Sequence, residues 1–184
     1  SGDHIYRMDY EAMIAAHERA GADLTLAALV VPREETHRFG VMIADAEGKV
    51  TGFQEKVKNA ASNLASMGVY VFDYAVLVEE LKAMVGTRKG FDFGHDVIPS
   101  MLGRRKLLCH RFEGYWRDVG TIQSYMEANL DCLDPSSGLD LAAWEVCTNA
   151  ETQGQGDRPP VFVGSGARVG NSLVARGCRV EGEV

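Results

Sequence analysis

Four charged residues stand where predicted strands end, and their types suit a site for a cation and a phosphate: Asp3, Glu55, Lys56 and Asp118. Two aspartates that meet at one edge of a sheet could hold Mg²⁺, which prefers one or two carboxylates together with substrate phosphates. Lys56 could neutralise a substrate phosphate as a point charge, and Glu55 could accept hydrogen bonds from sugar hydroxyls. For each residue taken singly, a surface charge or a structural turn is the better explanation, so the spacing alone does not establish a function.

The stretch 115–121, YWRDVGT, gives the best-defined setting for one of these residues. An apolar strand is expected to bring Asp118 to its carboxyl end, Gly120 to let the backbone turn, and Thr121 to begin a helix. Ligands of open α/β sheets bind outside the carboxyl ends of the strands, so an acid there is a candidate metal ligand. Taken alone, Asp118 is explained more simply as an acid near a helix N-terminus. The positions of that helix that recur at a spacing of about 3.6 residues are Ile122, Tyr125, Met126, Asn129 and Leu130.

Other residues are weaker candidates. His95 lies beside Asp92 and Asp96, which invites a metal-binding interpretation. No second histidine stands at ligand spacing, however, so a loop histidine or a hydrogen bond to a sugar explains it better. Gly40 and Gly68 would allow a ligand to approach the backbone closely.

The length of 184 residues and the net charge of -7 limit the classes of protein that the chain can represent. The length suits one domain, or one domain and part of another. The acidic balance gives no support to nucleic acid as a partner, and no apolar run is long enough to span a membrane. The four cysteines form no Cys-x-x-Cys pair, so we expect buried thiols in a reducing cytoplasm rather than a disulfide or zinc framework.

The order of the predicted elements indicates an α/β fold. Residues 1–4 read as the end of a strand, and a helix is expected from Asp9 to about Ala20. Residues 24–31 form an apolar run that is typical of a strand buried on both faces in a parallel sheet. This is a β–α–β order with the first strand cut away, so the chain looks truncated. The remaining expected elements are a hairpin of 39–44 and 50–55, a strand at 66–72, a helix capped by Asp73, a short helix near 97–102 and a strand at 107–112.

The composition shifts after residue 133. Residues 134–138 break the pattern, residues 148–160 are rich in Gly, Gln and Pro, and we expect 134–160 to form a linker. From residue 161, small or aliphatic residues recur about every six positions with glycines in the turns, as in a left-handed parallel β-helix. We therefore predict three parts: an α/β part (1–133), a linker (134–160) and the start of a left-handed β-helix (161–184).

Six motifs follow one another along the chain: SGDHIY (1–6), FGVM (39–42), GFQEK (52–56), ASMGVY (65–70), DFGHDVIP (92–99) and YWRDVGT (115–121). Together they resemble the motifs of the ADP-glucose pyrophosphorylases, the glucose-1-phosphate adenylyltransferases of bacterial glycogen synthesis. Sugar nucleotidyltransferases in general share the Gly-Asp and Glu-Lys elements, whereas the Asp-Phe-Gly and Trp-Arg-Asp-Val-Gly-Thr elements point to the ADP-glucose branch. The resemblance implies that residues 1–133 are the C-terminal part of a Rossmann-like nucleotidyltransferase domain.

The resemblance also implies a role for each candidate residue. Asp3 and Asp118 resemble the pair that holds the catalytic Mg²⁺, and Lys56 resembles the lysine that binds the phosphate of glucose 1-phosphate. The implied reaction is attack by the sugar phosphate on the α-phosphorus of ATP, which gives ADP-glucose and pyrophosphate. The other positions that match contacts to the sugar phosphate are Gly40, Glu55 and Ser66, with Asp92 and Trp116 near the sugar.

The chain departs from the family's pattern in two places. The glycine-rich, arginine-containing loop that cradles the nucleotide triphosphate is absent from these residues, and Val57 stands where the family has a proline. We therefore expect the 184-residue chain alone to be inactive. The family's usual homotetramers imply a homo-oligomer. Two alternatives remain open: another sugar-1-phosphate nucleotidyltransferase that uses UTP, GTP or dTTP, and a non-catalytic module that binds a sugar phosphate.

Overall fold

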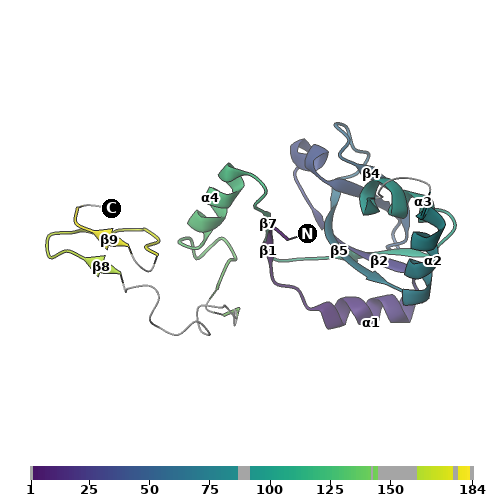
Figure 1. Cartoon of the computed structure of the whole chain (residues 1–184), viewed down its shortest axis with the longest axis horizontal. Coiled ribbons are helices and arrows are strands. Elements are labelled where there is room, and N and C mark those ends of the chain that lie inside the picture. Colours follow the sequence, from purple (N-terminus) through teal and green to yellow (C-terminus); the bar gives the residue numbers. More distant parts are fainter. Residues whose placement is uncertain (1, 87–91, 142, 145–160, 176–177, 183–184) are drawn as a thin grey trace. The chain divides into compact units, whose positions relative to one another are not determined.

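The computed structural model describes residues 2–86, 92–141, 143–144, 161–175 and 178–182. The described chain forms two compact units, which Figure 1 shows with their elements labelled. Unit 1 comprises Met8–Glu113, and unit 2 comprises Gly2–Arg7 together with Gly114–Val184. Each unit is considered by itself below.

Unit 1 is built on a five-stranded sheet with the strand order β4-β3-β5-β2-β6. The β2–β6 pair is parallel, and the β2–β5, β3–β5 and β3–β4 pairs are antiparallel. The elements of unit 1 are α1 (Tyr10–Ala20), β2 (Leu24–Val30), the 3₁₀ helix η1 (Arg33–Arg38), β3 (Gly40–Ala44), β4 (Val50–Glu55), β5 (Leu64–Phe72), α2 (Tyr74–Met84), the π-helix η2 (Phe93–Val97), α3 (Ile98–Met101) and β6 (Leu107–Arg111).

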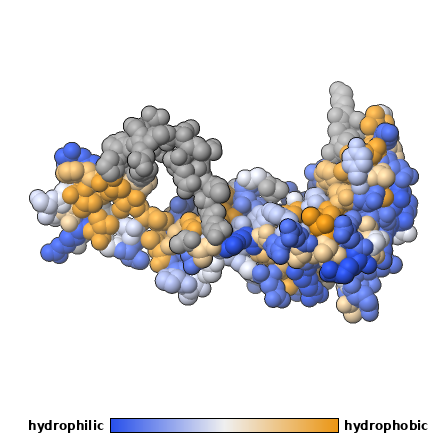
Figure 2. All heavy atoms as spheres, turned by 90° about the horizontal axis from the view of Figure 1, so that it is seen from below, coloured by the Kyte–Doolittle hydropathy of each residue, from blue (hydrophilic) through white to orange (hydrophobic). Residues whose placement is uncertain are grey.

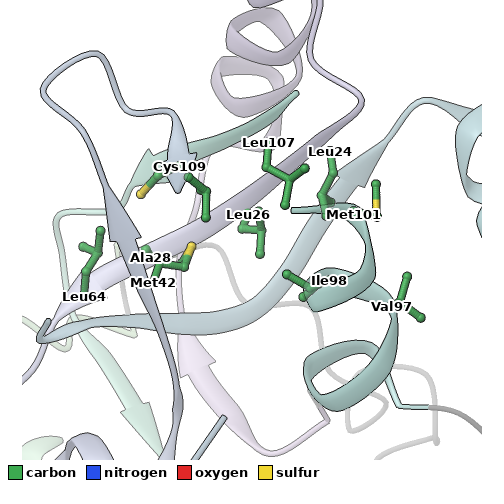
Figure 3. Close-up of a cluster of buried hydrophobic side chains, with 11 residues drawn as sticks. Leu24, Leu26, Ala28, Met42, Leu64, Val97, Ile98, Met101, Leu107 and Cys109 are labelled. Carbon is green, nitrogen blue, oxygen red and sulfur yellow. The ribbon is translucent and has the colours of Figure 1, made fainter. Parts of the chain in front are cut away.

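Strand β2 is buried on both faces, as its apolar run predicts. On one face Leu24 and Leu26 pack in a cluster with Met101 of α3, which Figure 3 shows in close-up. On the opposite face Thr25 is hydrogen-bonded to the buried His17 of α1, with 2.9 Å between Oγ1 and Nδ1. The parallel setting that this run suggested for β2 holds on one side only, because β2 pairs in parallel with β6 and antiparallel with β5. Burial on both faces shows that a strand is central, and it does not reveal the direction of its neighbours.

The helix boundaries follow the predicted caps. The Asp9 side chain accepts hydrogen bonds from the first turn of α1, and Gly21 ends that helix with a left-handed φ of 54°. Asp73 caps α2 in the same way. The predicted hairpin is confirmed as the β3–β4 pair.

Unit 2 contains a short antiparallel ribbon of β1 and β7. Residues 1–4 were expected to end a strand that belongs to a β–α–β unit with β2. Instead, β1 begins at His4 and pairs with β7 in a separate two-stranded sheet, so Asp3 precedes a strand rather than following one. The β–α–β unit stays a prediction, because its first strand was expected to lie before residue 1. The elements of unit 2 are β1 (His4–Tyr6), β7 (Trp116–Asp118), α4 (Ile122–Asp131), β8 (Phe162–Val163) and β9 (Arg179–Val180).

Helix α4 begins with a reciprocal capping box between Thr121 and Ser124, as the threonine predicts. Its periodic apolar positions do not face a core. Ile122 is 91% exposed, and the buried side of the helix carries Ser124 and Ala128. Periodicity identifies an apolar helix face, and only the tertiary structure decides whether anything covers it. The other exposed members of this face are Tyr125, Met126 and Leu130.

The C-terminal part of unit 2 contains the parallel pair of β8 and β9. Hydrophobic atoms gather on its exposed surface, at the left of Figure 2. The exposed apolar side chains there are Phe162, Val163, Val169 and Leu173. Most of the predicted linker, 145–160, lies outside the described residues, as does Cys147; Cys109, Cys132 and Cys178 are free thiols. Among the described helices, none is long and apolar enough to cross a membrane.

Candidate functional site

Three potential metal ligands meet at one end of the β1–β7 ribbon in unit 2. Asp3, His4 and Asp118 each offer one donor atom, and these atoms all lie within 4.8 Å of one another. Asp118 is the last residue of β7, as predicted, whereas Asp3 stands just before β1 rather than at a strand end. The antiparallel pairing places the start of β1 beside the end of β7, so the two aspartates meet although their strands run in opposite directions.

Gly120 lies directly against both carboxylates. A Cβ atom at Gly120 would be 3.0 Å from Oδ1 of Asp118 and 3.3 Å from Oδ2 of Asp3. The backbone N–H of Gly120 donates to Oδ1 of Asp118 at 2.9 Å, which holds that carboxylate in place. The two carboxylates and the imidazole are suitable ligands for a divalent cation, and Gly120 leaves space beside them.

The ribbon is fixed to α4 by a network on the other face of β7. Strand alternation points Arg117 away from Trp116 and Asp118. Arg117 donates to Glu127 at 2.9 Å and to Asp131 at 2.7 Å. Tyr115 donates to the same Asp131 oxygen at 2.7 Å. Burial, and to a smaller extent this hydrogen bond, raises the pKa of Tyr115 to about 12. The Tyr115 hydroxyl therefore stays protonated at neutral pH and donates to Asp131.

A second group of predicted residues surrounds Glu55 in unit 1. The Glu55 carboxylate lies between two glycines, Gly40 and Gly94. A Cβ atom added to Gly40 would be 2.5 Å from Oε2 of Glu55, and one added to Gly94 would be 2.4 Å from the same oxygen. The space above Gly40 is filled by Glu55 and by the ring of Phe53, which would be 2.4 Å from such a Cβ. The absence of a side chain at Gly40 therefore makes room for Glu55 and Phe53, and contact between Gly40 and a ligand stays a prediction.

Lys56 follows Glu55 in a left-handed backbone conformation with a φ of 52°. Its N–H donates to the carbonyl of Phe39 at 3.0 Å, which helps to hold this conformation. A non-glycine residue in this region is strained, and such residues cluster at functional sites. The Lys56 side chain is 62% exposed, and its ammonium nitrogen lies 3.8 Å from Oε1 of Glu55. It is thus presented to solvent beside the carboxylate.

Ser66 and Tyr70 come from β5, on either side of a bulge. Gly68 in the bulge has a φ of 66°, and its N–H donates to the Ser66 hydroxyl at 3.3 Å. Burial raises the pKa of Tyr70, the hydrogen bond with Ser66 opposes the rise, and the negative charges of Glu55 and Asp92 add to it. These interactions bring Tyr70 into the group, although the sequence analysis did not propose it. The two β5 residues lie opposite Leu26 and Ala28, which share a face of β2, and the bulge between them interrupts the alternation on which a sequence-based prediction would rely.

Asp92 has a structural use of its own as the N-cap of the π-helix. It accepts hydrogen bonds from the N–H groups of Gly94 at 2.8 Å and His95 at 2.9 Å. The His95 bond is the largest influence that lowers the pKa of Asp92, and burial opposes it. Among the described residues, Asp92, His95 and Asp96 do not form a cluster of converging metal ligands. His95 therefore lies within the π-helix beside Asp92, with 3.4 Å between Nδ1 and Oδ1, and is not the loop histidine that the sequence suggested.

Known proteins resemble this chain along its whole length. Residues 1–134 match the sequence model of the family described as "Nucleotidyl transferase", and the chain therefore belongs to the nucleotidyl transferase family of enzymes. The chain is 46% identical, over its whole length, to the glucose-1-phosphate adenylyltransferase of Halalkalibacterium halodurans, of which it covers 48%. It is 45% identical to the enzyme of that name from Thermotoga neapolitana and 43% identical to that from Geobacillus stearothermophilus, covering 44% and 47% of them.

The chain spans about half the length of these relatives, and all of it is matched. The resemblance to the glucose-1-phosphate adenylyltransferases that the motifs indicated is thereby confirmed.

Proposed function

We propose that this chain supplies the metal-binding and sugar-phosphate-binding residues of an enzyme that transfers the adenylyl group of ATP to glucose 1-phosphate. One observation carries the proposal: relatives named glucose-1-phosphate adenylyltransferase match 100% of the chain at 40 to 46% identity. The structure supports the proposal chemically, because Asp3 lies close to Asp118, as a cation site requires, and Lys56 lies beside Glu55, as a sugar-phosphate site requires.

The reaction requires two anions to be aligned. An oxygen of glucose 1-phosphate attacks the α-phosphorus of ATP, and the bond from that phosphorus to the oxygen bridging the β-phosphate breaks. Pyrophosphate leaves with the bonding electron pair, and no covalent enzyme intermediate is needed. Mg²⁺ bound by Asp3 and Asp118 would neutralise charge on the transferring group. The protein's own work is mainly to position the reactants.

The residues of unit 1 are suited to holding the sugar phosphate. Lys56 presents a point charge that would bind the phosphate of glucose 1-phosphate. The Glu55 carboxylate would accept hydrogen bonds from sugar hydroxyls, with the hydroxyls of Ser66 and Tyr70 beside it. Gly40 contributes by making room for Glu55, and Asp92 by capping the turn that carries Gly94. In unit 2, the ring of Trp116 offers an apolar surface for a sugar face.

Three broader features belong to the same proposal. The C-terminal residues would begin a left-handed β-helix, since Phe162 pairs in parallel with Arg179 after about three six-residue repeats. A homo-oligomer and a cytoplasmic location follow from the family resemblance, and free thiols are consistent with a reducing compartment. Sedimentation of the purified chain would test the oligomer.

Titration with glucose 1-phosphate tests the proposal directly. The chain should bind the sugar phosphate, and Lys56→Ala should abolish the heat of binding in isothermal titration calorimetry. Lys58→Ala, which removes an exposed neighbouring lysine, should leave binding intact. With ATP and Mg²⁺ added, a preparation of these 184 residues should form no ADP-glucose, because the triphosphate loop is not among them. Absence of binding, or equal loss in both lysine variants, would contradict the proposed site, and turnover would contradict the expected inactivity.

A further inference from the structure

The cluster at the end of the β1–β7 ribbon contains a nitrogen donor in addition to its two carboxylates. We propose that His4 is a third protein ligand of the divalent cation held by Asp3 and Asp118, and that it adapts the site to Mn²⁺ or Co²⁺ as well as Mg²⁺. The inference rests on the proposed function for the presence of a cation, and adds a ligand and a metal preference to it.

Strand pairing places the His4 side chain beside that of Asp118. The two residues are directly opposite each other in the β1–β7 register. The N–H of Val119 donates to the carbonyl of Asp3 at 3.0 Å, so His4 and Asp118 form the adjacent pair without mutual backbone hydrogen bonds. Side chains of such pairs are the closest in an antiparallel ribbon and point to the same face. The proximity is therefore a property of the backbone and does not depend on one side-chain rotamer.

The distances suit a shared cation. In an octahedral site with donors about 2.1 Å from the ion, neighbouring donors are about 3 Å apart and opposite donors about 4.2 Å apart. The donor atoms of Asp3, His4 and Asp118 lie within 4.8 Å of one another, so small side-chain rotations suffice to bring all three to one ion. Among the described residues, this is the one group of three acidic, histidine or cysteine side chains that converges in this way.

Trp116 restricts the orientation of the imidazole. It lies two residues before Asp118 on β7, diagonally across from His4, and therefore on the same face of the ribbon. The two rings make an edge-to-face contact with 5.0 Å between their centroids. A half-buried imidazole that packs against a larger ring loses less freedom when it binds an ion than a mobile surface histidine would.

The consequence is a change in metal preference. Mg²⁺ favours oxygen ligands and keeps most of its water, whereas imidazole nitrogen is a better ligand for transition metals such as Mn²⁺, Co²⁺ and Zn²⁺. A site with two carboxylates alone should distinguish these ions less strongly than one with an added imidazole. Removing His4 should thus weaken Mn²⁺ binding much more than Mg²⁺ binding.

Pulsed electron paramagnetic resonance of bound Mn²⁺ tests the ligand directly and needs no catalytic turnover. A coordinated imidazole produces ¹⁴N modulation of the Mn²⁺ echo, and this modulation should appear in the wild-type chain. It should vanish in His4→Gln and His4→Asn for the Mn²⁺ that stays bound. It should persist in His95→Gln, the matched control, which removes an exposed histidine that also lies beside a carboxylate, that of Asp92. Mn²⁺ affinity should fall about 10- to 100-fold in the His4 variants, while Mg²⁺ affinity, measured by competition, changes little.

The outcomes separate this inference from the proposed function. In one outcome, the wild-type chain binds Mn²⁺ without ¹⁴N modulation, while Asp118→Asn loses Mn²⁺ binding. That result would overturn the role of His4 and leave the aspartate site intact. Modulation that survives in both His4 variants would also overturn it. Mn²⁺ binding that is unchanged in Asp118→Asn would overturn the cation site itself, and His4 as its ligand with it. Two His4 variants are used so that failure of one to fold does not decide the result.

Discussion

Gly94→Ala offers a specific way to displace Glu55 without altering it. A Cβ at Gly94 would lie 2.4 Å from Oε2 and 2.9 Å from Cδ of Glu55, closer than non-bonded atoms can approach. The carboxylate must therefore move. The backbone of Gly94 is not in the left-handed region, so alanine can adopt its conformation. The substitution should act on the position of Glu55 rather than on the fold.

The size of the effect follows from the hydrogen bonds that Glu55 is proposed to accept. A hydrogen bond to a charged group contributes about 1.5–3 kcal/mol, and about 1.4 kcal/mol corresponds to a tenfold change in affinity. Displacing the carboxylate should therefore weaken glucose 1-phosphate binding by about 10- to 150-fold. The melting temperature should not fall greatly, because the ion pair that is disturbed is long, at 3.8 Å, and its lysine side chain is largely exposed.

Isothermal titration calorimetry with glucose 1-phosphate, together with a thermal melt of each variant, measures both quantities. Gly52→Ala is the matched control, because it lies on the same strand as Glu55 and the three atoms nearest to its Cβ would all belong to the Ile43 side chain, the closest at 3.0 Å. Sugar-phosphate affinity in Gly94→Ala equal to that of the parent chain would refute the reasoning. So would equal losses in the two glycine variants, since the effect would then not depend on Glu55.

Two further substitutions test the physical account of the structure. Lys56→Asn should relieve the strain of the left-handed backbone, which costs about 1–3 kcal/mol, because asparagine tolerates this conformation. The variant should therefore melt at a higher temperature while it loses phosphate binding. A lower melting temperature would contradict the strain. Burial raises the pKa of the Glu80 carboxyl, but hydrogen bonds from Arg104 and Arg105 outweigh it and leave the pKa below its usual 4.5. Its stabilisation is therefore complete above that pH and lost as the pH falls through the lowered pKa. Glu80→Gln should reduce the free energy of unfolding at pH 7 by about 1–2 kcal/mol, and urea melts should show this difference shrinking toward pH 3; a difference independent of pH would count against the ion pair.

Local sequence patterns were sufficient for much of unit 1. Asp9 and Asp73 cap the helices that they were expected to cap, because a cap depends on only three or four neighbouring residues. The β3–β4 hairpin formed as predicted, because its turn and both strands are contiguous. The burial of β2 on both faces was also visible in its composition.

Contacts between distant segments could not be predicted in this way. The pairing of β1 with β7 joins the two ends of the α/β part of the chain, and three-residue strands have too little pattern to identify their partners. The exposure of the apolar face of α4 was equally invisible, since periodicity does not specify what lies opposite a helix. The use of Gly40 and Gly94 to enclose the Glu55 carboxylate depends on close packing between β3, β4 and the π-helix.

The sequence by itself therefore determined the family, the helix caps, the strands of unit 1 and the types of residue available for chemistry. The tertiary structure decided which of these residues meet. It placed His4 with Asp3 and Asp118, and Tyr70 with Ser66 and Glu55, because strand register sets which side chains share a face. Register is fixed by packing across the whole sheet, so no local window of the sequence contains it.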